Sequence, residues 1–485
     1  MEQTIAAPRR APWATPLGCL LIVLALMIPR ALFAARFGLI GDEAYYAIWS
    51  FYPGFGYYDH SPAVAWLIGL GRALFGESEF AVRSLFLVAN VIVCVALYRI
   101  ADLLFADRRI GAAAAIAYSV TVGVLISFSV ATPDGPSTMF WALTLWAVAE
   151  FTRSRNANWW LLAGAFAGLG LLSKYTVVFL GAGLLFYLLT SRERMQWLKL
   201  WQVWAGGALA LLLFSPVVWI NSQRDWNSFR FQLGRSNISG DAMHALRPDE
   251  FLRFLIEESI QLLPPLFIFV ALGAALFFVR RAKPLALPVL TAVPMAAYFL
   301  FDALFGRVNP NWTAPLFPQL ALIGAWAAIT IRPRNAWRWP LDILYVLQVP
   351  LGLAIMLLAY LAIDTRSIPF GPRVAAFDFV YGWDDLERKV SVLARDNGVR
   401  WVDTTDYSLN GWLGYYARIA HDPLQVFQTN QPYRYQYMPP MDASLRAAPH
   451  LLIGNGAPNG AISLGAVTRD YAGEPLASYP VYLVK

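Results

Sequence analysis

Long apolar runs alternate with short polar loops over most of the chain. A helix crosses the hydrocarbon core of a bilayer with about 20 mostly apolar residues, and runs of this kind recur from Pro16 to Tyr360. The pattern predicts a polytopic α-helical membrane protein with about eleven spanning helices. They are expected near 16–35, 80–98, 110–130, 136–151, 158–172, 175–190, 202–220, 261–279, 285–304, 314–331 and 340–361.

The polarity pattern changes after residue 363. Helical periodicity appears in "WDDLERKVSVLARDNG" and "SLNGWLGYYARI", and strand-like runs appear in "VRWVDT", "HLLIG" and "PVYLVK". The sequence therefore predicts a transmembrane part at 1–363 and a small soluble α/β domain at 364–485. Two large loops interrupt the apolar pattern of the first part, at 36–79 and at 221–260.

Basic residues gather in every second loop. They are Arg9, Arg10, Arg99, Arg108, Arg109, Arg153, Arg155, Arg192, Arg194, Lys199, Arg280, Arg281, Lys283, Arg332, Arg334 and Arg338. The positive-inside rule places such loops in the cytoplasm. It predicts a cytoplasmic N-terminus, with the loops at 36–79 and 221–260 and the C-terminal domain on the outer side.

The amino-acid composition argues against several classes of function. The chain of 485 residues is 58% hydrophobic and 14% charged, and its net charge of +7 is scattered in short clusters with no continuous basic stripe, which argues against a nucleic-acid partner. The two cysteines, Cys19 and Cys94, both lie in expected spans, so the soluble part has no disulfide framework and no thiolate metal site. The short cytoplasmic loops contain no glycine-rich nucleotide-binding fingerprint.

The first external loop opens with "GDEAYYAIWSFYPGFGYYDHSP", from Gly41 to Pro62. Carboxylates at a membrane boundary bind cations, relay protons or act as a base on a hydroxyl, and Asp42 is the candidate for the base. The surrounding aromatic rings suit a sugar, an isoprenoid chain or the membrane interface. The structural alternative is that Asp42 and Glu43 are first-turn acids of a short helix, and both readings can hold together.

The other external loops add further candidates. Asp59 and His60 suit a metal or a phosphate, although one of each falls short of the usual ligand count, and a helix start is the alternative. Asp134 sits where an N-cap is expected. Lys174 lies in a very short external turn, where a lipid phosphate is the available anionic partner.

The motifs, in their order, resemble the GT-C membrane glycosyltransferases of the protein O-mannosyltransferase and lipid A aminoarabinose transferase type, including the rhizobial galacturonosyltransferases. The resemblance covers most of the chain. It is carried by "GDEAYYAIWS", "GYYDHSPAVAWLI", "ATPDGPSTMFWAL", "GLGLLSKYT", "NSQRDWNSFRFQLG", "NPNWTAP", "YGWDDL" and "RYQYM". It implies a GT-C fold.

The resemblance also implies roles for individual residues. Asp42 is the expected general base, with Glu43 and Asp134 beside it in the catalytic group. The donor phosphate is expected to contact Lys174, His60, Arg224 and Arg235. The substrate cavity is expected to be lined by Tyr45, Tyr46, Tyr57, Tyr58, Asn311 and Trp312.

One departure from the family pattern concerns the end of the first loop. Where the aminoarabinose transferases have an acidic-Lys-Pro stretch, this chain has "DHSP", which shifts the expected phosphate contact from His60 towards Lys174. Asp59 keeps an acidic position that is associated with a metal in those relatives. No cofactor is required by this scheme, and a divalent metal is compatible with it.

The function implied by the resemblance is inverting transfer of a sugar from a polyprenyl-phosphate donor to a hydroxyl or phosphate of an envelope acceptor. Lipid A, lipopolysaccharide core or another glycolipid is the expected acceptor, at the periplasmic face of the bacterial inner membrane. A protein O-glycosyltransferase is the alternative enzyme. A lipid-linked sugar transporter or flippase is the alternative outside the enzymes, but transporters place ionisable groups near the bilayer midplane.

Overall fold

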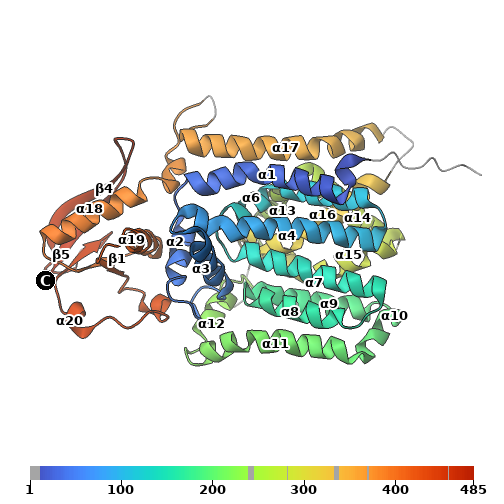
Figure 1. The fold of residues 1–485 in the computed structure, drawn as a ribbon, viewed down its shortest axis with the longest axis horizontal. Coiled ribbons are helices and arrows are strands. Elements are labelled where there is room, and N and C mark those ends of the chain that lie inside the picture. The colour runs from blue at the N-terminus through green and yellow to red at the C-terminus, as the bar shows by residue number, and fades with distance from the viewer. Residues whose placement is uncertain (1–10, 239–244, 281, 332–337, 369–370, 457) are drawn as a thin grey trace, which may run out of the picture.

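A computed structural model gives the fold of the chain and describes residues 11–238, 245–280, 282–331, 338–368, 371–456 and 458–485. A bundle of long helices carries an α/β part at one of its ends (Figure 1). The helices before that part are α1 (Pro16–Arg36), α2 (Gly41–Trp49), α3 (Ala63–Phe75), α4 (Glu79–Phe105), α5 (Arg108–Ser119), α6 (Val122–Ser129), α7 (Asp134–Ser154), α8 (Trp159–Leu171), α9 (Val178–Leu189), α10 (Arg192–Met195), α11 (Trp201–Ser222), α12 (Asn227–Gly234), α13 (Pro248–Leu262), α14 (Pro264–Arg280), α15 (Ala286–Asp302), α16 (Phe317–Thr330) and α17 (Arg338–Thr365).

The long apolar helices make this a multi-pass membrane protein. Six described helical segments are long and apolar enough to cross a membrane, and the number rises to nine if each of three bent pairs is one span. The bent pairs are α5 with α6, the helical segment ending in α9 with the one containing α10, and α13 with α14. Each expected span coincides with a helix or a bent pair, while the number of eleven stays a prediction.

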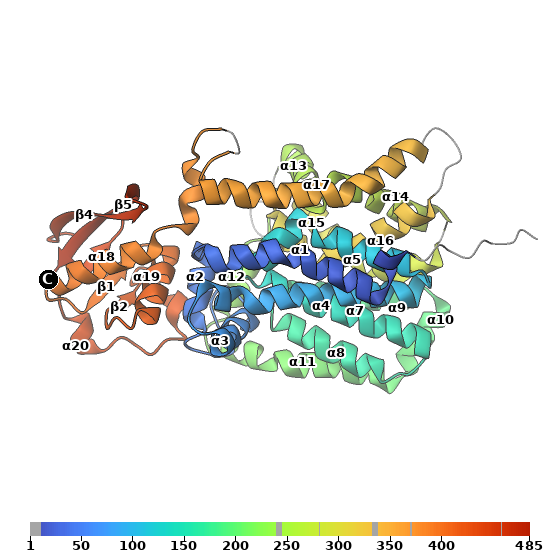
Figure 2. The ribbon, with the colours of Figure 1, turned by 45° about the horizontal axis from the view of Figure 1, so that its top comes forward.

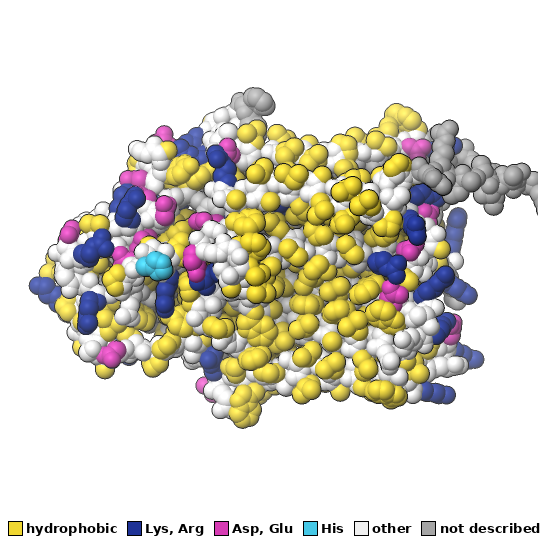
Figure 3. Space-filling model, viewed as in Figure 1, with side chains coloured by type: hydrophobic (Ala, Val, Ile, Leu, Met, Phe, Trp, Pro, Cys, Tyr) yellow, Lys and Arg dark blue, Asp and Glu magenta, His cyan; other side chains and the backbone are white. Residues whose placement is uncertain are grey.

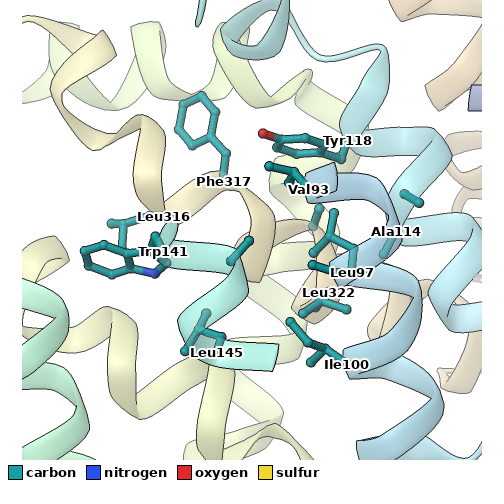
Figure 4. Packing of buried hydrophobic residues seen from close by; sticks show 14 of the residues in the cluster. Val93, Leu97, Ile100, Ala114, Tyr118, Trp141, Leu145, Leu316, Phe317 and Leu322 are labelled. Carbon is teal, nitrogen blue, oxygen red and sulfur yellow. The ribbon is translucent and has the colours of Figure 1, made fainter. Parts of the chain in front are cut away.

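The described part of the bundle has a close-packed apolar core. Side chains from α4, α5, α7 and α16, including Val93, Leu97, Tyr118 and Leu322, converge between the helices (Figure 4). The indole nitrogen of Trp141 donates to the Oε1 of Gln319 at 3.1 Å, so a polar contact also ties α7 to α16. These contacts hold the helix ends from which the loops emerge.

Charged side chains are distributed unevenly over the bundle. On the face in Figure 3, lysines and arginines lie at the end away from the α/β part and also over the α/β part, and a broad hydrophobic band covers the helices between the two ends. This distribution fits the expected cytoplasmic loops, and the sidedness itself stays a prediction. Arg9, Arg10, Arg281, Arg332 and Arg334 lie outside the described residues.

The C-terminal part contains a five-stranded sheet in the order β2-β1-β3-β5-β4. Its elements are α18 (Trp383–Asp396), β1 (Trp401–Thr404), α19 (Tyr407–Ile419), β2 (Gln425–Phe427), α20 (Ala443–Arg446), β3 (His450–Ile453), β4 (Ile462–Tyr471) and β5 (Glu474–Val484). β1 pairs in parallel with β2 and β3, while β5 pairs antiparallel with β3 and β4. The helices and strands expected from the sequence pattern are present, whereas β2 and β4 were not expected.

The α/β part is attached to the bundle mainly through α19, which lies beside α2 (Figures 1 and 2). The two helices approach so closely that a Cβ on Gly411 would lie 2.6 Å from the backbone nitrogen of Tyr45, so only glycine fits there. Trp412 donates its indole N–H to the carbonyl of Leu39 at 2.7 Å, and Tyr416 donates to Glu79 at 2.9 Å. This packing brings the start of α19 next to the start of α2.

Candidate active site

A cavity of about 340 Å³ lies where the bundle meets the α/β part, and its size is typical of a small-molecule site. Its walls come from the first loop, the starts of α2 and α7, the turn after α8, the segment around α12, η6 (Pro310–Leu316) and the C-terminal part. The lining residues are Asp42, Tyr45, Tyr46, Asp59, His60, Thr132, Pro133, Asp134, Lys174, Phe231, Arg235, Asn309, Asn311, Trp312, Tyr407 and Arg434.

Asp42 faces this cavity from the first turn of α2. Its Oδ1 accepts a hydrogen bond of 2.9 Å from the hydroxyl of Tyr407, which is the one hydrogen bond that its side chain makes with the described residues. The side chain is exposed to the cavity, and the surrounding walls remove part of its hydration. This burial raises the pKa of Asp42 above its usual range, in spite of the opposing hydrogen bond from Tyr407.

Glu43 points away from the cavity, although the sequence placed it in the catalytic group with Asp42. Successive helix residues are separated by about 100°, so the two acids face different neighbours. Glu43 is fully buried and receives hydrogen bonds from Arg83 at 2.6 and 2.8 Å, from the backbone of Ala131 at 2.7 Å and from that of Ile40 at 3.1 Å. Its position is that of a structural anchor, and the reading as a first-turn acid fits it better.

Asp134, Lys174 and Asn311 form one buried cluster. The ammonium of Lys174 lies 2.5 Å from the Oδ1 of Asp134, and the amide of Asn311 donates to the Oδ2 at 2.9 Å. Pro133 occupies the N-cap position of α7, so the Asp134 side chain does not cap that helix as the alternative reading proposed. Three loops that the sequence predicts to be external are joined at this point.

Asp59 is engaged by two donors at the other side of the cavity. Its Oδ1 lies 2.6 Å from Arg434, and its Oδ2 accepts from the hydroxyl of Tyr45 at 2.7 Å. A metal ion usually needs three or more protein ligands, and the described residues contain no group of three His, Cys, Asp or Glu side chains that could hold one. The donor set around Asp59 therefore does not fit the metal that the sequence allowed.

His60 lines the cavity and makes no hydrogen bond with the part of the chain that the structure describes. Its ring packs edge-on against Tyr46 at 6.0 Å. Burial, together with the positive charges of Lys174 and Arg235, holds the pKa of His60 well below its usual range. The imidazole is neutral at pH 7 and can donate one hydrogen bond to an anion.

Arg235 places a positive charge at the cavity wall. Its guanidinium lies 4.7 Å from the ring centre of Trp312 and 5.7 Å from that of Phe231, and it forms no ion pair with the described residues. The next residues along the chain fix its place, because Asp302 accepts from the backbone of Asn237 at 2.7 Å and from the hydroxyl of Ser236 at 3.0 Å.

The chain matches a family model described as dolichyl-phosphate-mannose-protein mannosyltransferase over residues 59–220. An undecaprenyl phosphate-alpha-4-amino-4-deoxy-L-arabinose arabinosyl transferase of Pseudomonas aeruginosa is 29% identical over 56% of this chain and 50% of its own length. A lipid A galacturonosyltransferase of Rhizobium johnstonii is 24% identical over 78% of each chain. The chain spans about half the length of the arabinosyl transferases and of the first curated relative that it matches.

Solved structures share the fold. The crystal structure of ArnT from Cupriavidus metallidurans in the apo state matches 96% of this chain and 97% of its own, with a TM-score of 0.62 and 15% identity. The chain therefore shares the GT-C fold of this structure. An oligosaccharyltransferase of Archaeoglobus fulgidus also matches, with a TM-score of 0.53 and 14% identity over 87% of this chain and 66% of its own.

Three residues that the sequence assigned to the site lie behind the cavity wall. Arg224 donates to the carbonyls of Gly56 and Gln436 at 2.9 and 3.1 Å, so it ties the first loop to the C-terminal part. Tyr57 stacks on Trp49 at 4.3 Å, and Tyr58 packs between Phe231 and Tyr433. None of the three lines the cavity. Of the three, Tyr58 contacts a lining residue, Phe231.

Six lining residues were not assigned to the site from the sequence, and two of them, Tyr407 and Arg434, contact its carboxylates. Both belong to the C-terminal part. Arg434 lies in "RYQYM", one of the motifs that carry the family resemblance, so a signal for it was present. Tyr407 had no comparable signal, because its place depends on Asp406, whose side chain caps α19 by accepting from the backbone of Ser408 and Leu409.

We expect Arg83→Met to destabilise the folded protein by about 3–5 kcal/mol, because Glu43 would be left as an unpaired buried charge. Arg247→Met is the matched control, since Arg247 pairs with Asp249 in an exposed ion pair, for which about 0–1 kcal/mol is expected. Thermal unfolding of both variants in one detergent measures the difference. Equal stability of the two variants would show that the buried pair does not anchor α2.

Proposed function

We propose that this protein transfers a sugar from a polyprenyl-phosphate donor to a hydroxyl or phosphate of an envelope glycolipid, either lipid A or lipopolysaccharide core. One observation carries the proposal. Among the described carboxylates and cations that line the cavity, Asp134 pairs with Lys174 and Asp59 pairs with Arg434, while Asp42 and Arg235 have no ionic partner. A free base and a free cation therefore face the same space.

The proposed reaction uses these two groups in a single displacement. The acceptor oxygen attacks the anomeric carbon and gives its proton to Oδ2 of Asp42, which carries no hydrogen bond from the described residues. The bond between the anomeric carbon and the phosphate oxygen breaks, and the electron pair leaves with the polyprenyl phosphate. Because attack and departure occur on opposite faces of the sugar, the anomeric configuration inverts.

Arg235 is the main proposed partner of the departing phosphate. A guanidinium offers a planar fork of N–H donors that suits phosphate oxygens. His60 adds a neutral N–H donor. Lys174 uses one of its three N–H donors on Asp134, so the others can contact the phosphate, with Asp134 and Asn311 holding the ammonium in place.

The relatives support the classes of donor and acceptor. A structure of ArnT from Cupriavidus metallidurans with bound undecaprenyl phosphate shares this fold, with a TM-score of 0.60. Two groups of relatives are named as an undecaprenyl-phosphate aminoarabinose transferase and as a lipid A galacturonosyltransferase. The family match over 59–220 favours protein hydroxyls as the alternative acceptor.

We place the protein in the bacterial inner membrane with the cavity facing the periplasm. The sidedness rests on the alternation of basic loops along the sequence. The proposed partners are a polyprenyl-phosphate sugar, a glycolipid acceptor and membrane lipid. The proposed step needs no cofactor.

We expect Asp42→Asn to lower transfer by about 10²–10⁴-fold, because the variant loses its general base. Lipid mass spectrometry of a deletion strain complemented with the wild-type or variant gene measures the effect. A lipid-linked sugar should accumulate, and one envelope glycolipid should lack that sugar, in the deletion strain and in the variant alike. Normal glycolipids in the variant strain would rule out Asp42 as the base.

The raised pKa of Asp42 predicts the acid limb of the pH–rate profile. The base must be deprotonated, so transfer is full above its pKa and is lost as the pH falls through it. Because burial raises this pKa above 3.8, the loss should begin at a higher pH than for a solvated aspartate. Titration of His60 should not change the transfer rate near pH 6.5, because the pKa of His60 lies well below that value. Rate measurements across pH with a saturating donor test both statements.

We expect Arg235→Ala to weaken binding of undecaprenyl phosphate by about 10–100-fold, the usual worth of hydrogen bonds to a charged group. Arg230→Ala is the control, because Arg230 lies in the same loop, is exposed and does not line the cavity. Titration of the lipid into protein in nanodiscs gives both dissociation constants. Similar constants for the two variants would remove Arg235 from the phosphate site.

A further inference from the structure

Two side chains of the C-terminal part contact the two first-loop carboxylates in the cavity. The hydroxyl of Tyr407 donates to Asp42 at 2.9 Å, and the guanidinium of Arg434 lies 2.6 Å from Asp59. Asp42 and Asp59 come from near the start of the chain, whereas Tyr407 and Arg434 are separated from them by more than 360 positions. The cavity is therefore complete only when both parts of the protein are present.

These contacts are part of a closed circuit of interactions, which runs through Asp42, Tyr407, Arg434, Asp59 and Tyr45. The guanidinium of Arg434 lies 4.9 Å from the ring centre of Tyr407, within the range of a cation–π contact. Tyr45 donates to Asp59 at 2.7 Å, and its ring packs edge-on against that of Tyr407 at 5.2 Å. Tyr45 and Asp42 lie on the same short helix, α2, so the circuit returns to its start. The ring of Tyr407 is thus held on two sides.

We propose that Tyr407 is a positioning residue for the transfer reaction, which holds Oδ1 of Asp42 so that Oδ2 faces the acceptor hydroxyl. Arg434, paired with Asp59, keeps the Tyr407 ring in place. The C-terminal α/β part is thereby a component of the reaction centre. This inference rests on the proposed function in one respect, namely that Asp42 acts as the base.

The charge state of Asp42 offers a direct readout. A hydrogen bond donated to a carboxylate favours its charged form and lowers its pKa. The titratable and charged groups around Asp42 are Tyr46, Asp59, Asp134, Arg235 and Tyr407. Asp59 and Asp134 raise the pKa of Asp42, whereas Arg235 and Tyr407 lower it. Loss of the Tyr407 hydroxyl alone should therefore move the titration of Asp42 to higher pH.

Tyr407→Phe should leave the attachment of the C-terminal part intact. The close approach of Gly411 to Tyr45 and the hydrogen bonds from Trp412 and Tyr416 hold α19 on the bundle, and none of them involves the Tyr407 hydroxyl. The substitution removes one oxygen atom and keeps the ring beside Arg434 and Tyr45. Its effect can be assigned to the bond with Asp42.

The first experiment titrates the infrared carboxyl band of Asp42 in the full-length protein in nanodiscs. The band is identified by its absence in Asp42→Asn. We expect Tyr407→Phe to shift the titration to higher pH, and Tyr433→Phe to leave it unchanged, because the Tyr433 hydroxyl makes no hydrogen bond with the described residues. An unshifted titration in Tyr407→Phe would overturn the proposal, whatever the reaction catalysed.

The second experiment compares transfer rates in the same variants. Tyr407→Phe should lower kcat by about 10–100-fold, since small misplacement of a catalytic group has effects of this size. The acid limb should move to higher pH, and binding of undecaprenyl phosphate should be unchanged. If Asp42→Asn is inactive while Tyr407→Phe behaves as wild type, this inference fails and the proposed function stands. If Asp42→Asn is fully active, the proposed function fails instead.

A double-mutant cycle tests the role of Arg434. Arg434→Gln leaves the buried carboxylate of Asp59 unpaired, and it should shift the Asp42 titration in the same direction as Tyr407→Phe. Adding Asp59→Asn removes the unpaired charge and should restore part of the shift. If Arg434→Gln leaves the Asp42 band unmoved, the circuit through Tyr407 does not act on the base.

Discussion

The site depends on one buried ion pair, between Glu43 and Arg83. Burying two charges is costly unless every donor and acceptor finds a partner. Here the carboxylate also accepts from the backbone of Ala131, and the guanidinium also donates to the carbonyls of Phe37 and Gly38 at 2.6 and 2.8 Å. This group of contacts therefore joins three parts of the protein, namely the chain before α2, the helix α4 and the segment that leads into α7.

Two cavity carboxylates are placed by this junction. Asp42 is the neighbour of Glu43 on α2, and Asp134 follows Ala131 by three residues at the start of α7. Asp42 has no support of comparable strength within its own short helix. The ion pair itself is shielded from the cavity, so of two adjacent residues of α2, Asp42 faces the cavity and Glu43 anchors the helix.

The sequence predicted which loops form the site better than it predicted which side chains face it. Apolar periodicity was enough to locate the spans, and the alternation of loops brought Asp42, Asp134, Lys174 and Asn311 to one end of the bundle. Which of Asp42 and Glu43 faces the cavity depends on the rotation of the short helix α2 about its own axis. That rotation depends on Arg83, an arginine near the start of an apolar span. The pairing of Lys174 with Asp134 is equally invisible along the sequence, since the two residues are brought together by separate helices.

Because the C-terminal part is synthesised last, the cavity is completed late in the assembly of the protein. Chains are made from the N-terminus, and domains generally fold as units in that order. Asp42 and Asp59 are thus in place long before Tyr407 and Arg434 exist, and the newly inserted bundle carries two carboxylates without these partners. The cavity reaches its final form only when the last segment of the chain has docked. A truncated nascent protein in the membrane would therefore be inactive.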